Sequence, residues 1–210
     1  MTFSSFVKNL QQAKFPDTFN PYRDRCERCD LHDAVQIRTE TLSSVLYAAA
    51  DIGIDSVWVG RDLGYRGGRR SGLPFTDDIR LSQAGAYWNI PTRRSTKDEP
   101  IAERTAAVVW KALQEIEQSV FLWNVFPLHP HLPGTPFCNR AHNRKEREWG
   151  ATMLAELMEL LSPATVIPVG KDAASVVCAI DGTNRVFPVR HPSYGGQSEF
   201  LRKISHFYNS

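Results

Sequence analysis

The strongest constraint on the fold is an alternation of two kinds of segment that begins near residue 38. The segments AERTAAVVWKALQEIEQ and REWGATMLAELMELL repeat apolar residues every three or four positions, as one face of a helix does. The strand candidates around them are DSVWVG, SVFLWNV, ATVIPVG and RVFPVRHP. Alternating strands and helices favour parallel strands with covering helices. We therefore predict an α/β fold, a three-layer α/β/α sandwich around a four-stranded, mainly parallel sheet.

The length and composition fit one soluble domain. A chain of 210 residues can bury one substantial core, so we predict a single domain over residues 1–210, with residues 1–37 as an N-terminal helical and loop extension. A net charge of +2 is too small to identify a polyanionic partner by itself. No segment reaches the length and apolarity of a membrane span. We expect a monomeric, cytoplasmic protein without a membrane partner.

The four cysteines do not form the dense framework of a small secreted domain. Cys26 and Cys29, in CERC, are more naturally a reduced pair, because a metal site would need two further ligands. Cys138 or nearby histidines could supply them only as a remote alternative. Cys178 lies in AASVVCAI, a helical pattern that favours a buried thiol. No metal and no cofactor are predicted.

Three strand candidates run directly into unusual polar loops. The first is followed by residues 60–62 (GRD), the second contains Asn124 before FPLHPH, and the last ends in residues 191–193 (HPS). Ligands of open α/β sheets bind at the carboxyl ends of the strands, so these loops should share one crevice. The VGKDAA turn lacks the complete pattern of a phosphate-binding loop and predicts only a helix start.

Together, the stretches VGRDLGYRGGRRSGLPF, LWNVFPLHPH and VRHPSYGG resemble the water-activating, base-reading and leaving-group motifs of the uracil-DNA glycosylase superfamily. They occur in that family's order and, with the spacers between them, cover residues 56 to 205. The resemblance implies a monofunctional DNA N-glycosylase. Such an enzyme flips a nucleotide out of DNA and hydrolyses its glycosidic bond, leaving an abasic site.

The resemblance assigns catalytic roles to Asp62 and His191. Breaking an N-glycosidic bond leaves positive charge on the sugar and negative charge on the departing pyrimidine, so a carboxylate and a hydrogen-bond donor are both useful. Asp62 matches the aspartate that orients the attacking water, and His191 the histidine that donates to the pyrimidine oxygen. Taken singly, each has an ordinary reading, as a capping aspartate or a structural histidine.

The same motifs imply a base-binding pocket formed by Gly60, Arg61, Gly64, Phe75 and Asn124. Phe75, in GLPF, would stack on the base, although a phenylalanine after a Gly-Pro turn can also fill a core. Asn124 would read the base edge, because its amide presents an acceptor beside a donor.

The loops beside these motifs supply the residues expected to contact DNA. Ser193 could bond a phosphate, Tyr194 could enter the space left by the flipped base, and two glycines would permit close approach of the backbone. The full predicted set is Tyr65, Arg66, Arg69, Arg70, Ser193, Tyr194, Gly195 and Gly196.

Three positions depart from the family's patterns. Similar relatives read Gly-Glu-Ala-Pro-Gly where this chain reads GRDLG over residues 60–64, so their mechanism cannot be transferred directly. The iron–sulfur branch would have a cysteine where Leu128 stands. Gly64 replaces a tyrosine that excludes 5-substituted pyrimidines in the strict uracil enzymes, which implies a pocket open to such substituents.

The predicted substrate is therefore uracil or a 5-modified pyrimidine, such as hydroxymethylated or glucosylated cytosine, and the setting is base-excision repair or defence against phage DNA. Two alternatives stay open. A catalytically inactive DNA-binding protein of the same fold would not need Asp62. A small-molecule nucleoside hydrolase would not need the basic YRGGRRSG loop.

Overall fold

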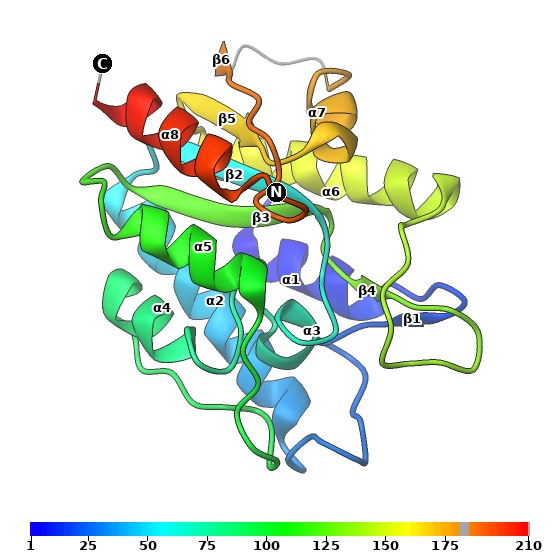
Figure 1. Cartoon of the computed structure of the whole chain (residues 1–210). Coiled ribbons are helices and arrows are strands. Elements are labelled where there is room, and N and C mark those ends of the chain that lie inside the picture. The colour runs from blue at the N-terminus through cyan, green and yellow to red at the C-terminus, as the bar shows by residue number, and fades with distance from the viewer. Residues whose placement is uncertain (181–184, 210) are drawn as a thin grey trace.

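The four predicted strand segments form one parallel sheet in the computed structural model, which describes residues 1–180 and 185–209 (Figure 1). Its strand order is β3-β2-β5-β6, and every neighbouring pair is parallel. The strands of this sheet are β2 (Ser56–Asp62), β3 (Val120–Phe126), β5 (Thr165–Pro168) and β6 (Arg185–Val186). A separate antiparallel pair joins β1 (Thr18–Phe19) to β4 (His129–Pro130).

Helices cover both faces of the sheet, which confirms the predicted three-layer α/β architecture (Figure 1). On one face β3 packs against α6 and α1, and on the other Trp58 of β2 packs against α8. The helices are α1 (Phe3–Gln12), α2 (Ala34–Ile52), α3 (Gly68–Ser71), α4 (Leu81–Trp88), α5 (Arg104–Leu113), α6 (Arg144–Leu161), α7 (Lys171–Val177) and α8 (Gln197–Tyr208).

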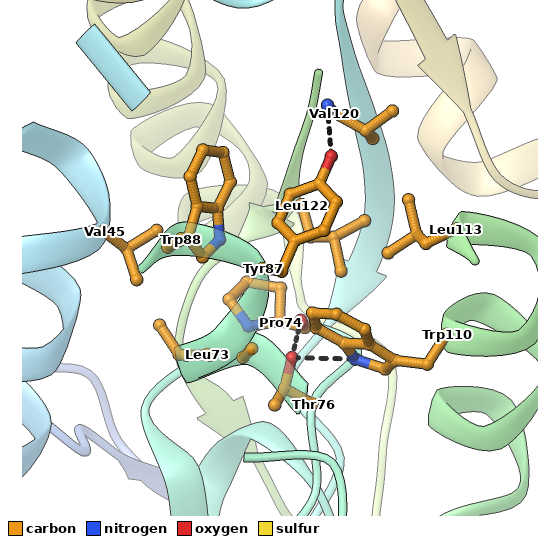
Figure 2. A pocket seen from close by; sticks show the side chains of 11 residues that line it. Val45, Leu73, Pro74, Thr76, Tyr87, Trp88, Trp110, Leu113, Val120 and Leu122 are labelled. Atoms are coloured by element: carbon orange, nitrogen blue, oxygen red, sulfur yellow. Dashed lines mark hydrogen bonds between the residues drawn. The ribbon is translucent and has the colours of Figure 1, made fainter. Parts of the chain in front are cut away.

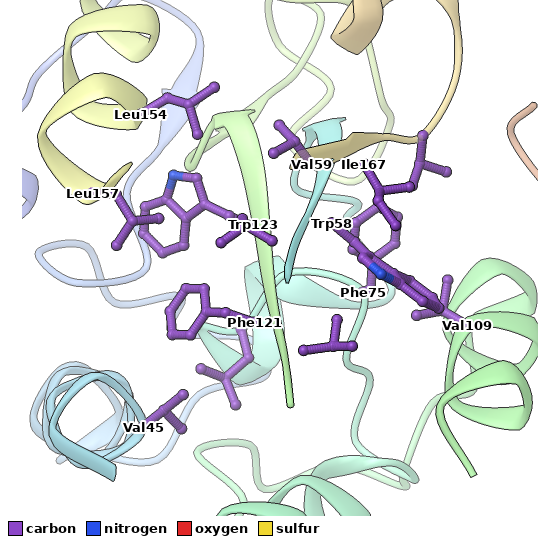
Figure 3. Close-up of a cluster of buried hydrophobic side chains, with 14 of the residues drawn as sticks. Val45, Trp58, Val59, Phe75, Val109, Phe121, Trp123, Leu154, Leu157 and Ile167 are labelled. Atoms are coloured by element: carbon purple, nitrogen blue, oxygen red, sulfur yellow. The ribbon is translucent and has the colours of Figure 1, made fainter. Parts of the chain in front are cut away.

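The alternation of side chains along the strands divides the core into two halves. Figure 3 shows Phe121 and Trp123 of β3 beside Leu154 and Leu157 of α6, and Trp58 on the opposite side of the sheet. Successive residues of a strand point to opposite faces, and both faces of this sheet are covered, so the strands are apolar almost throughout.

Local signals set the ends of the two predicted helices. The helix α6 begins at Arg144, three residues before the predicted segment, because Asn143 and Glu146 form a reciprocal capping box. The helix α5 ends at Leu113, before the end of the predicted segment AERTAAVVWKALQEIEQ. The apolar periodicity of the sequence therefore extends beyond the helix. Ile116, outside the helix, still packs against the core.

The predicted N-terminal extension packs into the same core as the sheet. Phe6 of α1 lies against Trp123, with ring centroids 5.7 Å apart. Farther along, the fully buried Arg38 pairs with Asp30 at 3.0 Å and donates to backbone oxygens of the segment before it. These contacts tie the segment between β1 and α2 to α2 itself.

Two smaller predictions have different outcomes. The prediction that the VGKDAA turn begins a helix is confirmed: α7 starts directly after Gly170. The prediction of a buried Cys178 is wrong, since this residue caps the carboxyl end of α7 and is exposed. None of the helices in the described part of the chain combines the length and apolarity needed to cross a membrane.

Candidate functional site

An open pocket of about 450 Å³ lies where the loops after β2, β3, β5 and the last strand segment meet. Its volume falls in the range typical of small-molecule sites. All three sequence segments predicted to share a crevice contribute to it, but the second contributes only Asn124 of β3 and no residue of FPLHPH. The predicted site residues among its walls are Arg61, Asp62, Gly64, Phe75, Asn124, His191, Ser193 and Tyr194.

The register of the sheet brings the first two loops together. Gly60 of β2 is paired with Asn124 of β3, and Asp62 with Phe126. A Cβ atom at Gly60 would collide with the Asn124 amide oxygen and with the ring of Phe75. Gly60 therefore makes room for both side chains at one wall of the pocket.

The Asp62 carboxylate is held on both of its oxygen atoms. Arg61 Nε donates to Oδ2 at 2.6 Å, and Oδ1 is hydrogen-bonded to His142 Nδ1. Arg61 also pairs with Asp172 at 2.8 Å, which ties the carboxyl end of β2 to α7. The Asp62 side chain is only 6% exposed, so these contacts fix its direction toward the pocket.

Sequence reasoning missed His142. It lies just before α6 and packs its ring against Phe126 at 6.2 Å. The only sequence signal was its place in the basic NRAHNRKER segment, before a helix. That segment gives no indication of contact with a residue 80 positions away.

His191 is arranged as a neutral donor. The backbone N–H of Ser193 donates to its Nδ1 atom at 3.1 Å. Burial lowers the pKa of His191, and the charge of Arg61 lowers it further against the opposing effect of Asp172. The neutral ring therefore carries its proton on Nε2, the nitrogen left free to donate to a ligand.

The Asn124 amide has no partner within the described chain. The residue is 2% exposed and lines the pocket, yet its side chain forms no hydrogen bond with any residue that the structure describes. A polar group without a protein partner is satisfied by water or by a ligand, and this amide faces the open pocket, so it is available to a ligand edge.

Phe75 holds a strained backbone conformation at the pocket wall. Its φ of 54° is rare for a bulky residue and costs on the order of 1–3 kcal/mol. Trp110 Nε1 donates to the Phe75 carbonyl at 3.1 Å and to the Thr76 hydroxyl at 3.3 Å. Figure 2 shows this part of the core, a second pocket of about 20 Å³ that is too small for a base.

The loop after His191 projects a single aromatic side chain. Tyr194 is 100% exposed and adopts a φ of 52°, followed by Gly195 with a φ of 75°. Gly196 is buried, and a Cβ there would collide with the His191 carbonyl. Ser193 lies deeper, with its hydroxyl 3.3 Å from that of Thr105.

The structure corrects the prediction that Arg69 and Arg70 contact DNA. Each is 4% exposed. Arg70 pairs with Asp78 at 2.6 Å and Asp98 at 2.5 Å, whereas Arg69 stacks on Phe19 and Phe137. Both side chains support the fold around α3. Two other residues of the same loop are accessible to solvent, since Tyr65 is half-buried and Arg66 is exposed.

The sequence predicted a pocket that is open beside Gly64, but a side chain lies there. A Cβ at Gly64 would collide with a carboxylate oxygen of Glu103, the residue before α5. The pocket is therefore not simply open at this point, because a carboxyl group occupies one side of it. Sequence reasoning missed Glu103, which lies in a segment read only as helical.

The described residues offer no evident metal centre. No group of three or more histidine, cysteine or acidic side chains is arranged there to hold an ion. Cys26 and Cys29 are unoxidised, with Cys29 buried beside Asp30. The pocket instead presents a carboxylate, an imidazole donor, an amide and an aromatic ring.

Comparison with protein families agrees with this arrangement. The model of the uracil-DNA glycosylase superfamily matches residues 50–209. The chain belongs to this superfamily, whose members are DNA glycosylases. Among solved structures, wild-type SMUG2 of Pedobacter heparinus is similar, with a TM-score of 0.67 and 15% identity over 99% of this chain and 97% of that one. No curated protein matches the chain.

Proposed function

We propose that the protein is a monofunctional DNA glycosylase that excises a flipped pyrimidine, either uracil or a 5-modified pyrimidine such as hydroxymethylated or glucosylated cytosine. The observation that carries this proposal is the buried, unpartnered amide of Asn124 in the pocket that Asp62 and His191 also line. A base edge would supply the missing partners of that amide.

The pocket residues account for each part of the reaction. Asp62 accepts a proton from water as the water oxygen bonds to the sugar C1′ atom. The bond from C1′ to the base nitrogen breaks, and its electron pair leaves with the base. His191 donates a hydrogen bond from Nε2 to the pyrimidine oxygen, where negative charge develops. The departed base anion takes up a proton from solvent and Asp62 releases its proton to solvent, so the products are free base and an abasic site.

His142 and Arg61 orient the carboxylate without using all of its lone pairs. Each contacts one oxygen of Asp62, so a second lone pair on either oxygen can still accept from water.

The rim of the pocket suits DNA better than a free nucleoside. Tyr194 stands fully exposed at the pocket, where it could fill the gap left by a flipped base. The exposed Lys171 lines the same pocket, and Arg66 is exposed on the loop after β2, so both could contact phosphates. Phe75 could stack on the base, and such stacking contributes about 1–3 kcal/mol, comparable to the cost of flipping.

Base release from defined DNAs tests the proposal. Oligonucleotides that carry uracil, a thymine mismatch, 5-hydroxymethylcytosine or its glucosylated form are incubated with the protein, and abasic sites are detected by alkaline cleavage. We expect cleavage of uracil or of at least one modified cytosine, and none of free deoxyuridine. Absence of abasic sites in every DNA would overturn the proposal, and release from the nucleoside alone would favour a nucleoside hydrolase.

The biological setting follows from the base that is released. Excision of uracil alone would favour repair, whereas excision of a hydroxymethylated or glucosylated cytosine would favour defence against phage DNA. We further propose that the protein acts as a cytoplasmic monomer.

A further inference from the structure

Glu103 places a carboxyl group in the wall of the pocket, beside the loop that follows Asp62. It lines the same pocket as Asn124 and Phe75. Its two oxygen atoms lie where Cβ atoms of Gly64 and Gly67 would be, so both glycines make room for the carboxyl group. The loop and the start of α5 are thus packed together around this one side chain.

The carboxyl group has no fixed partner. Within the described chain it accepts no hydrogen bond, forms no ion pair and does not cap α5. The hydrogen bonds of Glu103 are made by its backbone, whose N–H donates to Asp77 Oδ2 at 2.5 Å and whose carbonyl accepts from the Ala107 N–H at 3.1 Å. Burial raises the pKa of Glu103 to about 7, the charge of Asp77 adds to the increase, and Arg66 opposes it.

An unpaired carboxyl group in such a place opposes folding. A methionine could fill a similar volume without this cost. The group is therefore better explained by a ligand that supplies the missing donor than by packing. With a pKa of about 7, the group is mostly ionised above pH 7. As a carboxylate it only accepts hydrogen bonds, so a ligand bound there at such pH must present an N–H or O–H group.

Pyrimidine bases differ in this respect. The exocyclic groups of uracil are two carbonyl oxygens, which are acceptors. Cytosine carries a 4-amino donor, and a hydroxymethyl or sugar substituent at the 5-position adds hydroxyl donors. A carboxylate beside the base would attract the second class and repel the first.

We propose that Glu103 is a specificity-determining residue that selects flipped pyrimidines bearing an exocyclic donor, either an amino group or a substituent hydroxyl, over uracil. This inference rests on the proposed glycosylase function. The sequence implied only that Gly64 leaves room for a 5-substituent. Glu103 adds a preference for substituents that can donate a hydrogen bond.

The test compares single-turnover base release by the wild type and by Glu103→Gln, which keeps the shape and removes the charge. Four DNAs carry uracil, 5-hydroxymethyluracil, cytosine or 5-hydroxymethylcytosine. The second adds only a hydroxyl to uracil and the third contributes only the amino group, so the two donors are separated. Glu115→Gln, an exposed site just beyond α5, is the matched control.

A charge-assisted hydrogen bond corresponds to about a tenfold to hundredfold preference. We therefore expect the wild type to release at least one donor-bearing base faster than uracil. Glu103→Gln should reduce that ratio by about tenfold or more, and Glu115→Gln should leave it unchanged. A wild-type preference for uracil over every donor-bearing base, or equal effects of Glu103→Gln on all four DNAs, would overturn the inference. Failure of the wild type on these four DNAs and on DNA that carries glucosylated 5-hydroxymethylcytosine would instead refute the proposed glycosylase.

Discussion

Replacing Glu103 with glutamine should stabilise the folded protein at alkaline pH. The pKa of this carboxyl rises from 4.5 to about 7, mainly because of burial. Between these values the folded state binds more protons than the unfolded state, so its stability falls as the pH rises from 4.5 to 7. At 1.36 kcal/mol per pKa unit, the penalty is about 3 kcal/mol above pH 7 and is absent below pH 4.5.

Urea denaturation of the wild type and of Glu103→Gln at pH 4.5, 6 and 8 measures this effect. The free energy of unfolding of the variant minus that of the wild type should increase by about 2–3 kcal/mol between pH 4.5 and pH 8. The control Glu115→Gln should show no such gain. A constant difference between Glu103→Gln and the wild type at all three values would refute the reasoning that this carboxyl is buried without a partner.

Three further substitutions separate the roles of other residues. His191→Ala should slow base release most for poor leaving bases, because the departing pyrimidine loses its donor, and equal slowing of good and poor leaving bases in single-turnover assays would contradict that role. Tyr194→Ala should slow release from duplex DNA by about tenfold while sparing single strands, where no flipping gap must be filled; equal rates on duplex DNA would rule out the wedge. Arg70→Met should destabilise the fold by about 3–5 kcal/mol, because Asp78 is left buried without its partner, yet should leave the salt dependence of DNA binding unchanged. Arg66→Met, at an exposed site, should do the opposite and lower the salt slope by about one.

The sequence predicted those site residues that stand at strand ends. Asp62 and Asn124 are brought together by parallel pairing of two apolar strands, and His191 follows the last strand segment. Because the carboxyl ends of parallel strands meet at one edge, three separate loops could be assigned to one crevice before any contact was known.

The residues that sequence reasoning missed come from helix starts. Glu103 directly precedes α5, and His142 lies two positions before α6. Polar residues are ordinary at helix starts and carry no periodic signal there. Their contacts depend on how the helices pack against the sheet. No local pattern encodes that packing, because it is decided by side chains distant in the sequence.

The incorrect prediction for Arg69 and Arg70 has a similar cause. A cluster of arginines indicates positive charge but not exposure, and the acids that neutralise Arg70 lie 8 and 28 positions further along the chain. Only the fold brings Asp78 and Asp98 to that side chain.

The central claim is that Asp62 activates water for hydrolysis of a base from DNA. The most direct measurement is the single-turnover rate of abasic-site formation by Asp62→Asn and the wild type on the DNA that the wild type cleaves best, with DNA affinity measured in parallel. Loss of a general base predicts a decrease of about 10²- to 10⁴-fold with nearly unchanged affinity. An Asp62→Asn protein that releases the base at the wild-type rate would contradict the account.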